Sequence, residues 1–133
     1  MSKQAPLHFT TVALLASVKV EAVSATLEKL EQYLLSEGCE VLFEQSTAEL
    51  MAHNPASLPI AEFAGRVDLS IVVGGDGSML SAARKIAASG IPMLGINRGR
   101  LGFLTDISPD ELAERVAPVL RGHYTVSQRF MLD

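Results

Sequence analysis

The chain has 133 residues, of which 48% are apolar, 20% are charged and 5% are aromatic. This composition is typical of a folded globular domain and excludes disordered, collagen-like and disulfide-rich proteins. Eleven basic and fifteen acidic residues give a formal net charge of -4, which argues against a surface that binds nucleic acid or an anionic membrane through bulk positive charge.

The reactive side chains are few and scattered. The single cysteine, Cys39, has no partner for an intrachain disulfide, and His8, His53 and His123 are too far apart in sequence to indicate a metal site. We therefore predict no metal-ligating residues. The N-terminus lacks a signal-peptide pattern and no apolar run reaches the length of a membrane helix, so we expect a cytoplasmic protein that binds no membrane.

The first half of the chain alternates between apolar patterns typical of strands and apolar patterns typical of helices. Residues 9–16 form an apolar run typical of a strand buried on both faces. Apolar residues then recur at steps of three and four over 20–34, which predicts a helix that Gly38 ends as a C-cap. Residues 39–44 resemble a second strand, and the Pro- and Asn-containing segment 46–59 is expected to be a surface loop or an excursion at the sheet edge.

The second half continues the alternation. Residues 68–73 predict a third buried strand, 78–89 a helix with Met79, Leu80, Ala83, Ile86 and Ala87 on one face, and 93–96 a fourth strand. A capping pattern at 108–111 predicts another helix. Alternating apolar residues from 124 to 132 predict a final strand. This order is typical of an α/β layered domain with a mostly parallel sheet, whose ligands usually bind at the carboxyl ends of the strands.

A glycine-rich turn follows the third predicted strand. Gly74-Gly75-Asp76-Gly77-Ser78 stands between a buried strand and an amphipathic helix. Glycines there let the backbone approach a ligand, and the free N–H groups of the helix start suit a phosphate. The P-loop pattern is excluded because Gly-Lys-Ser/Thr is absent, and the dinucleotide fingerprint is excluded because Leu80 replaces its third glycine. The alternative is a tight turn with Asp76 or Ser78 as N-cap.

Asp76 has the chemistry that a turn alone does not require. A carboxylate beside a bound phosphate is repelled by it unless it binds Mg²⁺ or takes a proton from an attacking hydroxyl. Both roles indicate phosphoryl transfer. As an N-cap, Asp76 would contribute about 1 kcal/mol and have no chemical role.

A second glycine-rich segment, residues 95–106, follows the fourth predicted strand. It contains Arg98, Arg100 and Phe103. The two arginines are candidates for phosphate contacts or are solvated surface charges. Phe103 either stacks on a base or belongs to the core.

Together, the two segments resemble a known family. Gly74-Gly75-Asp76-Gly77 is similar to the signature that NAD kinases share with diacylglycerol kinases, sphingosine kinases and, more distantly, 6-phosphofructokinases. Residues 95–106 resemble the second motif of bacterial NAD kinases. The resemblance implies a three-layer Rossmann-like fold of the phosphofructokinase type. It also implies transfer of the terminal phosphoryl group of ATP, with a divalent metal such as Mg²⁺, to the 2′-hydroxyl of the adenosine ribose of NAD.

The resemblance also assigns roles to individual residues. Asp76 would accept the proton of that hydroxyl, and Gly75, Gly77, Leu80 and Phe103 would form part of the NAD site, with Leu80 and Phe103 near the adenine. The remaining alternatives are a lipid or sugar kinase of the same superfamily and a nucleotide-binding or oligomerising module without activity of its own.

The family resemblance further predicts the domain organisation. NAD kinases have a second, β-rich domain that is absent from this chain, so we expect an amino-terminal fragment that is inactive alone. The expected parts are an N-terminal tail (1–8), an α/β nucleotide-binding domain (9–122) and a strand (123–133) leading into the missing domain. An exposed edge at that strand would favour a homo-oligomer.

Overall fold

The structure is a computed structural model that describes residues 9–16, 21–53, 55–74, 76–97, 116, 120 and 130–132. For residues 21–23, 76–80, 83, 96–97 and 130–132 it describes the backbone path and not the side chains.

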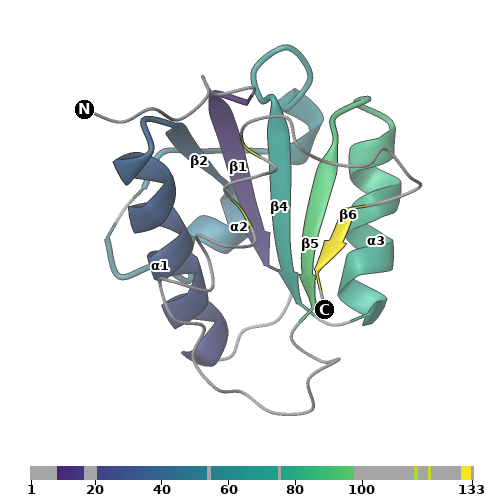
Figure 1. Ribbon diagram of the computed structural model, residues 1–133. Helices are drawn as coiled ribbons and strands as arrows, with labels where there is room; N and C mark the ends of the chain where they lie inside the picture. Colours follow the sequence, from purple (N-terminus) through teal and green to yellow (C-terminus); the bar gives the residue numbers. More distant parts are fainter. Residues whose placement is uncertain are drawn as a thin grey trace.

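A six-stranded sheet forms the centre of the molecule (Figure 1). Its strands stand in the order β3-β2-β1-β4-β5-β6. Their bounds are β1 Thr11–Ala16, β2 Glu40–Glu44, β3 Ser57–Leu58, β4 Leu69–Gly74, β5 Met93–Asn97 and β6 Phe130–Leu132. Each of the five neighbouring pairs is parallel, which confirms the predicted parallel sheet.

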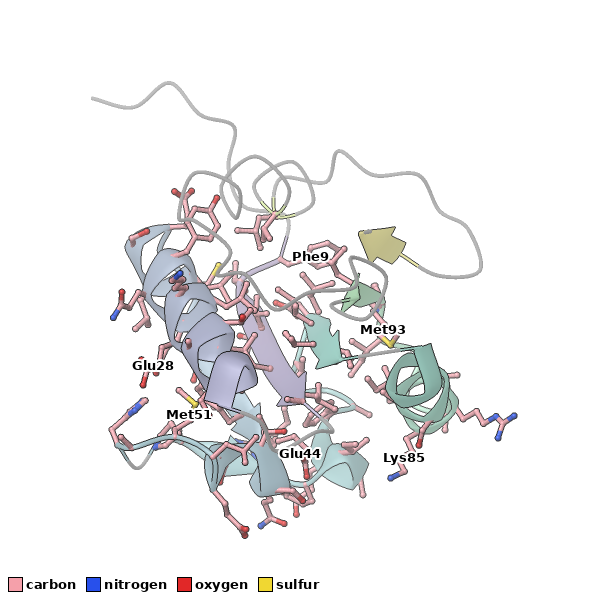
Figure 2. The ribbon with its side chains drawn as sticks, turned by 90° about the horizontal axis from the view of Figure 1, so that it is seen from below. Phe9, Glu28, Glu44, Met51, Lys85 and Met93 are labelled. Carbon is pink, nitrogen blue, oxygen red and sulfur yellow. The ribbon has the colours of Figure 1, made fainter. Side chains whose placement is uncertain are left out.

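Helices cover both faces of this sheet. They are α1 (Glu21–Ser36), the short α2 (Gln45–Ala48), the 3-10 helix η1 (Ile60–Glu62) and α3 (Asp76–Ala87). Seen from below, α1 and α3 lie on opposite sides of the strands (Figure 2). The predicted three-layer α/β architecture is therefore confirmed.

The alternation of side chains along each buried strand divides the core into two parts. In β1, Val12 and Leu14 pack on the α1 side, whereas Ala13 and Leu15 pack on the α3 side. All four are buried, because a parallel sheet with helices on both faces leaves neither face to solvent. The α1 side also receives Leu27, Leu30 and Leu34 of the predicted helical stripe, together with Val116 and Leu120.

The end of α1 follows the predicted capping chemistry. Gly38 has φ of +93°, a left-handed conformation that costs other residues roughly 1–2 kcal/mol. Its N–H donates to Leu35 O at 3.1 Å, and Cys39 N donates to Leu34 O at 3.0 Å. These bonds satisfy the last carbonyls of the helix and turn the chain into β2.

Some predicted boundaries were wrong. Segment 46–59 contains most of α2 and the edge strand β3, so the surface-loop alternative is wrong and the predicted excursion at the sheet edge is confirmed. The helix predicted from Ser78 begins at Asp76, since the turn residues continue directly into it. Within α3, Ala82 is buried and Ala87 is exposed, so the inner face is rotated from the predicted one. The predicted start of the helix near 108 and residues 124–129 lie outside the described residues.

Candidate functional site

The carboxyl ends of β1 and β4 meet at the point where the strand order reverses. From β1 the chain builds β2 and β3 on one side, and then β4, β5 and β6 on the other. Ala16, the last residue of β1, is aligned with Val73 near the end of β4. In open α/β sheets, such a reversal leaves a crevice at the carboxyl ends where ligands bind.

The glycine-rich turn leaves β4 at this edge. Gly74 is the last residue of β4, and Asp76 and Gly77 are the first two residues of α3. Strand and helix both use negative φ, so positive φ does not explain the glycines at 74 and 77. Gly75 lies outside the described residues. The backbone thus brings Asp76 and the N-terminus of α3 to the strand end, while the side-chain positions of Asp76 and Leu80 are not described.

The second motif begins on the neighbouring strand. Asn97, the last residue of β5, is aligned with Gly74. The two predicted segments therefore start side by side at one edge of the sheet. Arg98, Arg100 and Phe103 fall outside the part of the chain that the structure describes, so their predicted roles remain predictions.

A pocket of about 220 Å³ lies between the sheet and α3. Leu15 and Val72 of the two central strands and Ala82 of α3 provide buried apolar walls. The polar lining residues are Glu44, Ser46, Ser81 and Lys85. In Figure 2, Glu44 at the end of β2 and Lys85 of α3 appear at the lower edge of the view.

A hydrogen-bond network fixes one wall of this pocket. Glu44 caps α2: its Oε2 accepts from Ser46 N at 2.9 Å and its Oε1 from Thr47 N at 3.1 Å. Thr47 is fully buried, and its Oγ1 accepts from Ala16 N at 2.9 Å. The Thr47 hydroxyl can donate to Glu44 Oε1 at 3.0 Å or to Ala16 O at 3.2 Å. The end of β1 is thus attached directly to α2.

Sequence reasoning missed this pocket. No sequence pattern assigned Glu44, Ser46 or Lys85 to a site. Lys85 is exposed and borders the pocket. Its neighbour Arg84 is exposed and does not line the pocket. The usable signal was the position of Glu44 and Ser46 at the carboxyl end of a predicted strand.

Other predictions about reactive residues concern positions outside this edge. His53 is exposed, and its Nε2 lies 3.1 Å from Glu31 Oε2. Among the described residues no three His, Cys, Asp or Glu side chains gather in a way that could hold a metal ion. Within the same residues, no helix is long and apolar enough to cross a bilayer.

Comparison with protein families identifies the family to which this chain belongs. The family model of the ATP-NAD kinase N-terminal domain matches residues 12–124. The chain belongs to this family. The match includes both glycine-rich segments and confirms the resemblance that they suggested.

Full-length members of the family are longer than this chain. The NAD kinase of Pseudomonas putida (strain GB-1) is 46% identical over 127 residues, and that of Hahella chejuensis is 44% identical over the same length. Each alignment covers 95% of this chain and 43% of the relative. The chain therefore spans less than half the length of these curated relatives.

A solved structure shares the fold. Yeast NADH kinase, crystallised with NADH, aligns with a TM-score of 0.59 and 20% sequence identity. The alignment covers 90% of this chain and 40% of that one. At this identity the likeness shows the fold alone.

Proposed function

We propose that this chain is the catalytic-base portion of an NAD kinase, which transfers the terminal phosphoryl group of ATP to the 2′-hydroxyl of the adenosine ribose of NAD and forms NADP. The observation that carries the proposal is that both family motifs begin at adjacent strand ends, with Gly74 aligned to Asn97. Family membership supports it independently.

In the proposed reaction, the 2′-hydroxyl oxygen of the ribose forms a bond to the terminal phosphorus of ATP while Asp76 accepts the hydroxyl proton. The bond from that phosphorus to the bridging oxygen breaks, and ADP leaves with the electron pair. The N-terminus of α3, where Asp76 and Gly77 stand, favours the negative charge of the phosphates through the helix dipole.

The remaining residues of the proposed site contact NAD. Gly75 and Gly77 let the dinucleotide approach the backbone, and Leu80 and Phe103 pack near its adenine. These roles come from the family resemblance. The position of Leu80 in the first part of α3 is compatible with its role.

A divalent metal such as Mg²⁺ would be held in the proposed complex mainly by the phosphates of ATP. Mg²⁺ in kinases is usually held by one or two carboxylates together with substrate phosphates and waters. Because the Asp76 carboxylate is the proposed proton acceptor at this site, substrate phosphates and waters would supply the ligands of the metal. When bound, the metal would neutralise charge on the transferring phosphoryl group.

We further propose that the chain is inactive alone. It spans 43% of the length of its curated relatives, and phosphoryl transfer depends mainly on positioning both substrates. This coverage also favours the second candidate function, a nucleotide-binding module that gains activity only with the rest of the enzyme.

The test measures NADP formation from NAD, ATP and Mg²⁺, after intact-mass analysis has verified the 133-residue chain. We expect no NADP from the chain alone and NADP formation when it is fused to the remaining segment of the Pseudomonas putida relative. In the fusion, Asp76→Asn should lower kcat by about 10²- to 10⁴-fold, because proton acceptance is lost.

The matched control is Glu62→Gln, which also replaces a carboxylate by an amide. Glu62 is exposed and its ion pair with Arg66 is long, at 3.9 Å, so this variant should keep the activity of the fusion. Full activity of Asp76→Asn would contradict the proposed base. NADP formation by the chain alone would contradict its inactivity.

A further inference from the structure

The pocket beside α3 has a shape and chemistry that the roles proposed so far do not use. Leu15, Val72 and Ala82 are 5%, 1% and 8% exposed, so the walls they form are apolar and buried. The volume of about 220 Å³ is smaller than that of a typical complete ligand site, about 300–1,000 Å³. It suits one flat ring system of a larger ligand.

The polar groups at the pocket offer complementary hydrogen bonds. Glu44 Oε2 accepts a hydrogen bond from Ser46 N, and a carboxylate oxygen can accept a second. Lys85 is exposed and makes no ion pair with any described residue. The pocket therefore combines an acceptor-only carboxylate with a donor-only ammonium group.

We propose that this pocket binds the adenine base of the phosphoryl donor, a nucleoside triphosphate, separately from the dinucleotide that receives the phosphoryl group. Glu44 accepts a hydrogen bond from the exocyclic amine of the base, and Lys85 donates to a ring nitrogen. The inference rests on the proposed transfer from ATP and adds the location of the donor's base.

The pocket lies within reach of the proposed phosphoryl-transfer position. Its wall residue Ala16 is aligned with Val73, next to Gly74 at the start of the first motif. Along α3, Asp76 and Lys85 are about 13 Å apart at 1.5 Å per residue. An extended nucleoside triphosphate spans a comparable distance, so a base at the pocket leaves the terminal phosphate near the start of α3.

The charges of the pocket predict which base is preferred. Hypoxanthine differs from adenine by a carbonyl in place of the exocyclic amine. That carbonyl and the Glu44 carboxylate are both hydrogen-bond acceptors, so no hydrogen bond can form between them. Loss of a hydrogen bond to a charged group weakens binding by about 10- to 100-fold. The wild-type chain should therefore bind ADP more tightly than inosine diphosphate by at least about tenfold.

The test is isothermal titration of the 133-residue chain with ADP and with inosine diphosphate, in the absence of NAD. Ser81→Tyr places a large ring at the pocket from an exposed helical position and should weaken ADP binding by about tenfold or more. The matched control, Ala87→Tyr, adds the same side chain at an exposed position of α3 outside the pocket, and should bind ADP as the wild type does.

A second variant tests the contact with the base. Glu44→Gln keeps one oxygen that can accept from Thr47 N, leaves the exposed Ser46 N–H to water, and gains an amide that can donate to the carbonyl of hypoxanthine. It should bring the affinity ratio of ADP to inosine diphosphate close to one. Circular dichroism before each titration verifies that the variants are folded.

Three results would overturn the inference: no saturable ADP binding at millimolar concentration, equal ADP affinity in Ser81→Tyr and Ala87→Tyr, or an affinity ratio unchanged by Glu44→Gln. None of them depends on catalysis. NADP formation by the fusion protein with any of these results would retain the proposed function and remove the donor pocket. Selective ADP binding without NADP formation would retain the donor pocket and contradict the proposed function.

Discussion

Thr47 is the residue that joins the end of β1 to the segment after β2. Its side chain is fully buried and its hydroxyl bonds to Ala16 N at 2.9 Å. In Thr47→Val the shape is kept, but the Ala16 N–H and one Glu44 oxygen lose a partner. We expect a loss of roughly 1–3 kcal/mol in the free energy of unfolding, measured by urea denaturation.

The same substitution at an exposed threonine provides the control. Thr10 Oγ1 donates to Asp68 Oδ2 at 2.9 Å where water can replace it, so Thr10→Val should cost less than about 1 kcal/mol. Equal losses in the two variants would show that burial of the Thr47 network adds nothing to stability.

At the scale of the element, α1 is held by its buried stripe. Leu30 is fully buried against the sheet, whereas Leu35 on the same helix is 55% exposed. Leu30→Ala should lower the free energy of unfolding by about 2–5 kcal/mol, since it removes apolar contacts and leaves a cavity. Leu35→Ala should change it by about 0.5 kcal/mol or less. Thermal and urea unfolding of both variants would detect a difference, and similar losses would contradict this packing.

Elements with a strong local pattern were predictable from sequence. The central strands are continuous apolar runs, and α1 has an apolar stripe that ends at Gly38, so each could be located without its partners. By contrast, α2 is only four residues long and depends on the Glu44 cap and the buried Thr47. The strand β3 has two residues and forms by pairing with Phe43 and Glu44. Tertiary contacts specify these two elements, and local periodicity cannot reveal them.

The candidate site was predictable to a similar extent. A strand-to-helix turn placed Asp76 and Gly77 at the carboxyl edge because that position follows from topology. The pocket was not predictable, because Leu15, Glu44, Ile60, Val72 and Lys85 come from separate elements that meet only in the folded sheet. The spacing of these residues along the sequence does not show that they are neighbours in the folded chain.

At the scale of the whole molecule, β6 is the last strand of the described sheet order. An end strand offers backbone groups for pairing with another chain, and we predict that the 133-residue chain self-associates through this edge. Sedimentation velocity should show a dimer or larger species, and Met131→Lys should shift it toward monomer because edge lysines oppose pairing.

Ser57→Lys on β3, at the opposite end of the sheet, is the matched control and should leave the sedimentation unchanged. A wild-type chain that is monomeric at every concentration would contradict self-association. An equal effect of both lysines would contradict the assignment to β6.

The central position of β1 also has a consequence for biosynthesis. This strand leaves the ribosome before the other strands, yet its neighbours are β2 and β4, and β4 begins only at Leu69. Parallel neighbours of this kind must wait for distant sequence, which makes their assembly slow. During translation, the edge of β1 that pairs with β4 therefore remains unpaired until residues 69–74 have been made, and this interval is when nascent chains are most exposed to aggregation.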